Sequence, residues 1–200
     1  MEKTISSTRT LAGVSFLSAL GLLLMILNTA LPIFPIFLRI DLGDLPVLIG
    51  YRVYGLKAGI AVAFMKNFLH LFLSQTLGIG ELLNFLLSVT FILCLHLLLE
   101  KGILRRKLDN SMGYPLVLSV ATVVTAFVAV IANYVIMLPL YNVLLGITPE
   151  MILSMANAFN PAIDGLLPYF LLILFPFNLL KFGILSLLYF LIEKNLRSVK

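Results

Sequence analysis

The sequence carries little charge for its length. Asp, Glu, Lys and Arg make up 12% of its 200 residues, whereas a soluble domain carries about 25%. Hydrophobic residues make up 61%, and the mean hydropathy is +1.11. A soluble domain could not cover its surface with so few charges, so the composition indicates an integral membrane protein. The length suits one domain spanning residues 1–200.

Cysteine and the common catalytic motifs are also missing. The single cysteine, Cys94, excludes an intramolecular disulfide and a Cys-based metal site. No Gly-rich loop ends in Gly-Lys-Ser/Thr, and no His-Glu-x-x-His motif occurs. We therefore expect no catalytic residue, no metal and no cofactor. One enzyme alternative stays open, because Ser74 lies one turn after His70 and could form the Ser–His pair of a membrane hydrolase.

Long apolar runs predict an all-α protein with six transmembrane helices. A spanning helix needs about 20 mostly apolar residues. Asp44 is expected to cap the short second helix, and Pro139 to end the fifth. A more polar stretch, residues 146–165, is expected to hold a short interfacial helix. The predicted helices cover about residues 11–30, 45–54, 58–73, 81–99, 114–138 and 166–192.

The distribution of basic residues orients these six helices. With six spans, both termini share a side with the loops between helices 2 and 3 and between helices 4 and 5. The positive-inside rule then places both termini in the cytoplasm. Because the net charge of +5 follows this pattern, we expect a lipid bilayer and no nucleic acid as partner. The basic residues on the predicted cytoplasmic side are Lys3, Arg9, Arg52, Lys57, Lys101, Arg105, Arg106, Lys107, Lys194, Arg197 and Lys200.

Polar residues inside the predicted spans gather at one depth. Lys66 and Lys181 lie within apolar helices, where a charge costs about 2.5–3.5 kcal/mol unless it faces a cavity or a partner. The proposed topology places them, with several other polar side chains, near the midplane or in the outer half. Glu81 could simply pair with either lysine, and single asparagines could bind neighbouring helices together. The accumulation nevertheless predicts a ligand pocket that opens outward. Its other members are Asn67, His70, Asn84, Asn133, Tyr134 and Asn178.

Five local strings occur in a fixed order along the sequence. They are residues 34–46 (FPIFLRIDLGDLP), 66–70 (KNFLH), 80–85 (GELLNF), 133–134 (NY) with 139–141 (PLY), and 176–181 (PFNLLK). In this order they resemble the riboflavin-specific substrate-binding (S) components of energy-coupling factor (ECF) transporters, and the resemblance covers about residues 9–195. Arg39 stands where lysine is more usual in that family, and Gly43 where serine is.

The resemblance implies a six-helix S component of the bacterial cytoplasmic membrane that captures riboflavin from outside. It also implies three partners: a transmembrane coupling protein and two cytosolic ATPases, which alone use ATP. Aromatic residues could wall the flat flavin ring, while amides and charged groups bind its polar edge. The expected ligand-contacting residues are Asn178, Lys181, Asn133, Glu81, Asn84, Lys66, Asn67 and Asp41.

Two further surfaces are expected. Residues 31–43, with Pro35, Phe37, Leu38 and Arg39, should form a lid over the pocket. Small residues of the first helix, Ser15, Ala19 and Ala12, should form the docking surface for the coupling protein. The alternatives left open are an S component for another vitamin or for flavin mononucleotide (FMN), and the membrane hydrolase.

Overall fold

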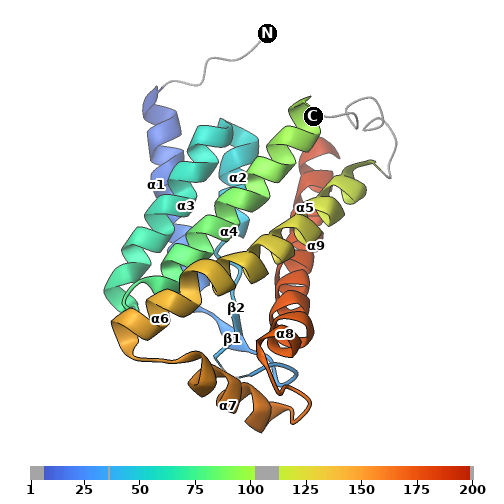
Figure 1. The fold of residues 1–200 in the computed structure, drawn as a ribbon. Coiled ribbons are helices and arrows are strands. Elements are labelled where there is room, and N and C mark those ends of the chain that lie inside the picture. The colour runs from blue at the N-terminus through green and yellow to red at the C-terminus, as the bar shows by residue number, and fades with distance from the viewer. Residues whose placement is uncertain (1–6, 36, 102–112, 199–200) are drawn as a thin grey trace.

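The computed structural model describes residues 7–35, 37–101 and 113–198. The described chain is mostly helical, and the helices pack side by side as a bundle (Figure 1). Within the described residues, five helical stretches are long and apolar enough to cross a membrane. They are Ser7–Ile26, Leu56–Leu73, Ile79–Leu99, Gly113–Leu145 and Leu166–Glu193.

The first half of the chain contains four helices and a short β-hairpin. The hairpin strands are antiparallel, with Thr29 opposite Ile40 and Ala30 opposite Arg39. Gly55 turns the chain between the second and third helices with a φ of 90°, which glycine adopts without a steric penalty. The elements are α1 (Ser7–Ile26), β1 (Thr29–Ala30), β2 (Arg39–Ile40), α2 (Leu45–Tyr54), α3 (Leu56–His70), the 3₁₀ turn η1 (Leu71–Leu73), α4 (Ile79–His96) and the π-helical segment η2 (Leu97–Lys101).

The second half contains two long interrupted helices joined by a shorter one. Each long helix includes a π-helical segment, in which the turn is wider than in an α-helix. The elements are α5 (Gly113–Ala132), η4 (Asn133–Met137), α6 (Leu138–Leu145), α7 (Pro149–Phe159), α8 (Leu166–Tyr169), η5 (Phe170–Leu174) and α9 (Phe175–Ser198).

The chain crosses the bundle repeatedly between its two ends. In Figure 1, α1 runs from the upper to the lower end, the short α2 rises, α3 descends and α4 rises. The continuous helix of α5, η4 and α6 descends, and α8 to α9 rises. The described part of the chain therefore begins and ends at the same end of the molecule. Helix α7 lies across the opposite end, which we call the α7 end.

Several helix boundaries differ from those predicted, and two of the differences have a clear cause. The first helix ends at Ile26 rather than residue 30, because Asn28 donates to the Met25 carbonyl at 3.1 Å and Thr29–Ala30 join the hairpin. Pro139 does not end the fifth helix, which continues through α6 to Leu145. A proline lacks an N–H and its ring collides with the preceding turn of a regular α-helix. The wider turn of η4 just before it relieves that collision.

The prediction that Asp44 caps α2 is also corrected. Its carboxylate makes no capping hydrogen bond to the backbone. It accepts instead from the ammonium of Lys66 and the hydroxyl of Ser88. A buried ammonium requires a nearby carboxylate, and this requirement outweighs the weaker cap.

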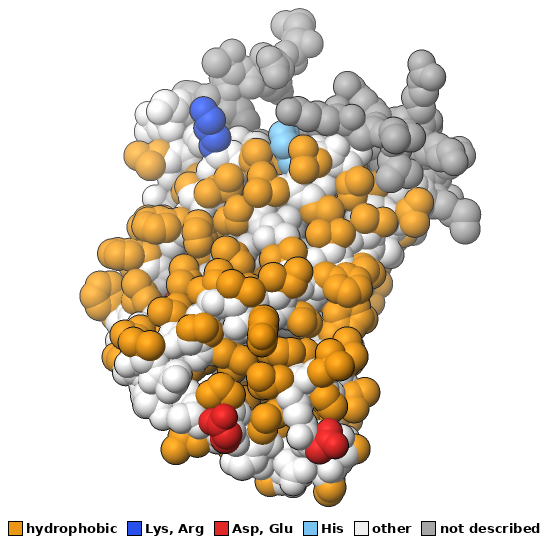
Figure 2. All heavy atoms as spheres, viewed as in Figure 1, with side chains coloured by type: hydrophobic (Ala, Val, Ile, Leu, Met, Phe, Trp, Pro, Cys, Tyr) orange, Lys and Arg blue, Asp and Glu red, His pale blue; other side chains and the backbone are white. Residues whose placement is uncertain are grey.

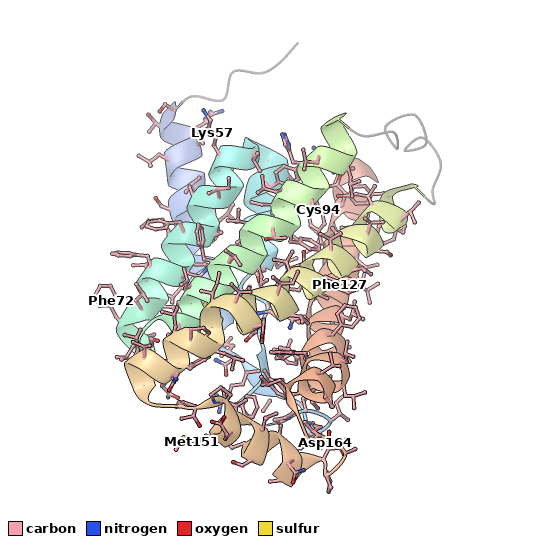
Figure 3. All side chains as sticks on the ribbon, viewed as in Figure 1. Lys57, Phe72, Cys94, Phe127, Met151 and Asp164 are labelled. Carbon is pink, nitrogen blue, oxygen red and sulfur yellow. The ribbon has the colours of Figure 1, made fainter. Side chains whose placement is uncertain are left out.

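The apolar interior forms two clusters. One fills the bundle between α2, α3, α4, α5 and α9 and contains Val62, Phe91 and Phe182. The other lies nearer the α7 end and contains Ile163, Phe170 and Phe177. On the outside of the helices, large apolar side chains such as Phe72 and Phe127 point away from the bundle (Figure 3). Exposed apolar side chains of this kind are what a lipid-facing surface requires.

Candidate functional site

A cavity of about 380 Å³ lies among the helices toward the α7 end. This volume is within the range of roughly 300–1,000 Å³ found for small-molecule sites. Its walls come from the hairpin, the α3–α4 loop, α4, η4, α6, α7, α8, η5 and α9. Most of the lining is apolar, and the aromatic side chains there are Phe37, Tyr141, Tyr169, Phe170 and Phe177.

The hairpin covers one side of the cavity. Phe37, Leu38, Arg39 and Asp41 all line it. Phe34 anchors the same segment, because its ring packs edge-on against Phe177 of α9 with the centroids 5.3 Å apart. The segment is thus a wall of the cavity that the surrounding helices hold by packing.

An ion pair joins the hairpin to α9. The ammonium of Lys181 donates to Asp41 Oδ2 at 2.9 Å, and Asp41 Oδ1 accepts from the Gly43 N–H at 2.9 Å. The pair therefore holds the end of the hairpin against the cavity wall.

Gly43 permits a close crossing beside this pair. A Cβ at residue 43 would lie 2.9 Å from the Gly21 carbonyl oxygen of α1 and 2.9 Å from Asp41 Oδ1. Such contacts are too short for real side chains. The absence of a side chain at Gly43 therefore lets the hairpin end pack directly on α1.

A second charged network lies behind the cavity wall. Lys66 of α3 is completely buried, and its ammonium lies 2.7 Å from Asn84 Oδ1 and 3.0 Å from Asp44 Oδ1. Ser88 donates to Asp44 and lies 2.7 Å from the Asn84 carbonyl oxygen. Asn84 lines the cavity, whereas Lys66, Asp44 and Ser88 are not among its lining residues.

Two other asparagines use their amides differently. Asn133 donates through Nδ2 to the Ala129 carbonyl, and Asn178 to the Leu174 carbonyl, both at 2.8 Å. Both residues line the cavity. Because each Nδ2 is engaged by its own helix, each Oδ1 is left as a hydrogen-bond acceptor.

Glu81 binds His70 and Ser74 rather than Lys66 or Lys181, the two partners suggested by the sequence. Its carboxylate lies 2.7 Å from His70 Nδ1 and accepts from the Ser74 hydroxyl at 2.8 Å. Ser74 Oγ also accepts from the backbone N–H groups of Thr76 and Gly78. This cluster fixes the α3–α4 loop, which contributes Thr76 to the cavity, next to Gly80 in the first turn of α4. Ser74 donates to Glu81 rather than to His70, so the geometry does not supply an activated serine.

The structure brings most of the predicted ligand-contacting residues to the cavity. Asp41, Asn84, Asn133, Asn178 and Lys181 line it. Of the expected lid residues, Phe37, Leu38 and Arg39 line it and Pro35 does not.

Three predicted contacts lie elsewhere. Lys66, Asn67 and Glu81 are buried but do not line the cavity. Lys66 and Glu81 are held by the networks described above, and Asn67 donates to the Ala63 carbonyl of its own helix at 2.8 Å. Sequence reasoning grouped them with the lining residues but could not tell which way each side chain turns.

Sequence reasoning also missed most of the apolar wall. The clearest sequence signal for part of this wall was in α7, where Ile152 and Met155 are three residues apart and so share a helix face. The lining residues not predicted as ligand contacts are Thr76, Gly80, Leu83, Leu87, Leu138, Tyr141, Ile147, Ile152, Met155, Tyr169, Phe170, Leu174 and Phe177. In the described ranges, no group of three or more His, Cys, Asp or Glu side chains could hold a metal ion.

Lipid-facing helices around one largely apolar cavity define a membrane-embedded small-molecule binding protein. Residues 9–193 match the model of the family described as the ECF transporter, substrate-specific component. The chain belongs to this family, which confirms the resemblance seen in its motifs. Members of the family are transport components and not enzymes.

Similar proteins and a solved structure agree with this assignment. The chain is 31% identical over 190 residues to the "Riboflavin transporter FmnP" of Bacillus subtilis (strain 168), covering 94% of this chain and 91% of that protein. It is 28% identical over 195 residues to the "Riboflavin transporter RibU" of Staphylococcus aureus (strain TCH60), covering 97% and 93%. A solved structure titled "Structure and mechanism of the S component of a bacterial ECF transporter" matches with a TM-score of 0.73 and 26% identity, covering 97% and 98%.

Proposed function

We propose that this chain is the riboflavin-binding S component of an ECF-type vitamin transporter. It captures riboflavin from outside the cell and delivers it inward when joined to an ATP-hydrolysing module. The observation that carries the proposal is a cavity of about 380 Å³, whose aromatic and aliphatic walls surround a few convergent polar groups. The printed names of its relatives supply the identity of the vitamin.

The lining fits the chemistry of a flavin. The isoalloxazine ring is flat and largely apolar, and aromatic side chains such as Tyr169 and Phe177 supply its walls. Its pyrimidine edge carries carbonyl acceptors and an N–H donor. Asn178 Oδ1 offers an acceptor, and the Lys181 ammonium and Asn84 Nδ2 offer donors.

The transport partners are a transmembrane coupling protein and two cytosolic ATPases. The sequence contains no P-loop motif, so ATP binding falls to those subunits. The proposed docking surface for the coupling protein is the stripe of Ala12, Ser15 and Ala19 on α1, all of which are exposed. Small residues let another helix approach closely. Gly13, by contrast, faces the bundle, since a Cβ there would collide with the Tyr54 side chain.

The proposed topology is six membrane passes with both termini in the cytoplasm of a bacterial cell. The short α2 makes the second pass together with the hairpin that precedes it. Figure 2 shows Lys and Arg side chains at the end where α1 begins and Asp and Glu side chains at the α7 end, with apolar side chains over the band between them. The labelled Lys57 and Asp164 lie at these opposite ends (Figure 3). The positive-inside rule then orients the basic end toward the cytoplasm and the cavity toward the outside.

Titration of the purified chain with riboflavin tests the proposal. In detergent, without ATP or partners, the chain should quench flavin fluorescence with one-to-one saturation. FMN and an unrelated vitamin such as thiamine serve as comparison ligands. Saturation by another vitamin and not by riboflavin would replace the assigned ligand, and no saturable signal at micromolar riboflavin would overturn the proposal.

FMN is a second candidate ligand, favoured by Arg39. Lys181 and Lys66 each have an aspartate partner within 3.0 Å. Arg39 also lines the cavity, but in the described part of the chain it bonds Asn28 Oδ1 and no carboxylate. It is exposed, so a phosphate placed there would meet a free positive charge at low desolvation cost. Arg39→Gln should then weaken FMN binding more than riboflavin binding, and equal losses would argue against a phosphate contact.

A further inference from the structure

Lys66 reaches the cavity only through another residue. Its side chain has no exposed surface and does not line the cavity. A Cβ at Gly21 of α1 would lie 3.2 Å from Lys66 Cδ, so the lysine stem is confined against that helix. Its ammonium ends on Asn84 Oδ1, and Asn84 does line the cavity.

The ammonium determines how the Asn84 amide is turned. An ammonium has donors and no acceptor, so only the oxygen of the amide can face it. Lys66 Nζ lies 2.7 Å from Asn84 Oδ1, and Ser88 Oγ lies 3.3 Å from the same oxygen. Both contacts use the oxygen and leave the amide nitrogen turned away. Among the described residues, Asn84 Nδ2 makes no hydrogen bond.

The other lining asparagines are fixed in the opposite sense. Asn133 and Asn178 each donate through Nδ2 to a carbonyl of their own helix, which leaves Oδ1 as an acceptor. The cavity therefore offers two asparagine oxygens and one asparagine NH₂ group. Of the two groups that contact the Asn84 oxygen, the Ser88 hydroxyl could equally accept from an amide N–H, whereas the nearer Lys66 ammonium can only donate, so Lys66 sets this difference.

Asp44 makes the buried lysine tolerable. Its Oδ1 lies 3.0 Å from Lys66 Nζ, and the Asp44 side chain is itself buried. Removal of Lys66 alone would leave an uncompensated carboxylate in the bundle, which is strongly destabilising. A useful variant must therefore remove both charges.

We propose that Lys66 is a positioning residue that fixes Asn84 as a hydrogen-bond donor to an acceptor atom of the ligand. The inference rests on the proposed function, in which that ligand is riboflavin. Riboflavin has ring carbonyls, ring nitrogens and ribityl oxygens that can accept such a bond. Lys66 itself does not touch the ligand.

Riboflavin titrations of four proteins test this role as a double-mutant cycle. They are the wild type, Asn84→Ala, the charge-balanced pair Lys66→Met with Asp44→Asn, and the combination of all three. Asn84→Ala should weaken binding about 5- to 150-fold, the loss of one buried hydrogen bond. The charge-balanced pair should weaken binding about 5-fold or more when Asn84 is present. In the Asn84→Ala background it should change affinity less than about twofold, because its effect passes through Asn84.

Asn84→Asp provides a measurement that does not depend on removing Lys66. Aspartate keeps an oxygen for Lys66 and has no N–H to offer the ligand, so riboflavin affinity should fall at least as far as in Asn84→Ala. The matched control is the pair Arg52→Gln with Glu193→Gln, which removes a 2.9 Å ion pair outside the cavity lining. Its riboflavin affinity should stay within about twofold of wild type, although thermal unfolding in detergent should show a lower stability.

The outcomes separate this inference from the proposed function. If the wild type binds riboflavin and the losses of affinity across the cycle are multiplicative, Lys66 acts on the fold and not through Asn84. That result would overturn the inference alone. Full affinity in Asn84→Asp would do the same. No riboflavin binding by the wild type would overturn the proposed function and the inference with it.

Discussion

At the residue scale, the polar side chains of the bundle divide by what holds them. Lys181 is paired with Asp41 and Lys66 with Asp44, so neither lysine presents an isolated charge to the membrane interior. The free energy lost by burying an unpaired charge would far exceed the free energy gained from its contacts. The proposed ligand would therefore meet hydrogen-bonding groups in fixed orientations, beside two lysines whose charges are each balanced by an aspartate.

Asn178→Ala should weaken riboflavin binding about 5- to 150-fold, or roughly 1–3 kcal/mol. The change removes an acceptor from the cavity and leaves a buried polar group of the ligand without its partner. Isothermal calorimetry on the purified variant measures the loss. Asn142→Ala is the matched control, since Asn142 is exposed on α6 and does not line the cavity. Equal affinity in both variants would show that Asn178 serves only the helix.

Lys181→Ala should weaken binding and also loosen the hairpin. The substitution removes a donor from the cavity and leaves the buried Asp41 carboxylate without its 2.9 Å partner. Lys181→Ala with Asp41→Ala removes both charges, so it should recover part of the lost thermal stability without recovering riboflavin affinity. Calorimetry and thermal unfolding measure the two effects separately. Recovery of affinity in the double variant would mean that Lys181 acts only by restraining Asp41.

The sequence predicted the depth of these residues better than their partners. Helical spacing and the cost of an intramembrane charge were enough to group Lys66, Asn84, Asn178 and Lys181. The same reasoning treated Asp44 as a helix cap and offered Glu81 as a partner for the lysines. Partner choice depends on distances between helices that are remote in sequence, such as the 140 residues between Lys181 and Asp41. No periodicity within one segment carries that information.

At the element scale, the prolines of the long helices also show what local sequence rules cannot predict. Pro139 is the second residue after η4, and Pro176 is the second residue after η5. Each wide turn allows the helix to continue past its proline, and each lines the cavity through residues such as Asn133 and Phe170. The local rule that proline ends a helix was reasonable for Pro139 but wrong. Packing of the neighbouring helices stabilises the long helix beyond what local propensity predicts.

The segment 31–43 should act as a lid whose accessibility depends on the ligand. Arg39 is exposed and supplies a trypsin site within it. Bound riboflavin should slow cleavage after Arg39, because the ligand would add contacts to Phe37 and Leu38 and reduce local opening. Timed digestion followed by mass spectrometry measures the rate. Cleavage after the exposed Lys57, at the other end of the molecule, is the internal control. Equal protection at both sites would indicate global stabilisation rather than a lid.

The small residues of α1 should serve assembly and not riboflavin binding. Ala19→Trp should abolish co-purification with the coupling module and ATP-dependent uptake, since the indole blocks close helix approach. Riboflavin affinity of the isolated chain should remain within about twofold of wild type, because Ala19 is exposed and does not line the cavity. Val123→Trp, on the exposed face of α5, is the matched control. Loss of riboflavin binding in Ala19→Trp would place that residue in the bundle's own packing.

At the scale of the whole molecule, the arrangement is polarised along the bundle. The cavity, α7 and the exposed acidic Glu150 lie toward one end, and the exposed basic residues Arg52 and Lys57 toward the other. Composition and hydropathy were sufficient to predict a membrane bundle and its apolar spans. The 10-residue α2 was the difficult case, since at about 1.5 Å per residue it covers only about half of a bilayer core. Its proposed role as a pass rests on its place between the hairpin and α3, which a hydropathy profile does not show.

The orientation in the membrane can be tested with single cysteines, because Cys94 is the chain's one native thiol. In a Cys94→Ser background, Glu150→Cys places a thiol at the start of α7 and Lys57→Cys places one at the start of α3. Both positions are exposed and lie at opposite ends. A membrane-impermeant maleimide added to intact cells should label the Glu150→Cys protein and should label the Lys57→Cys protein only after the membrane is permeabilised. The reverse pattern would place the cavity on the cytoplasmic side, contrary to capture of riboflavin from outside. Labelling of both in intact cells would place these ends on the same side and contradict the six-pass topology.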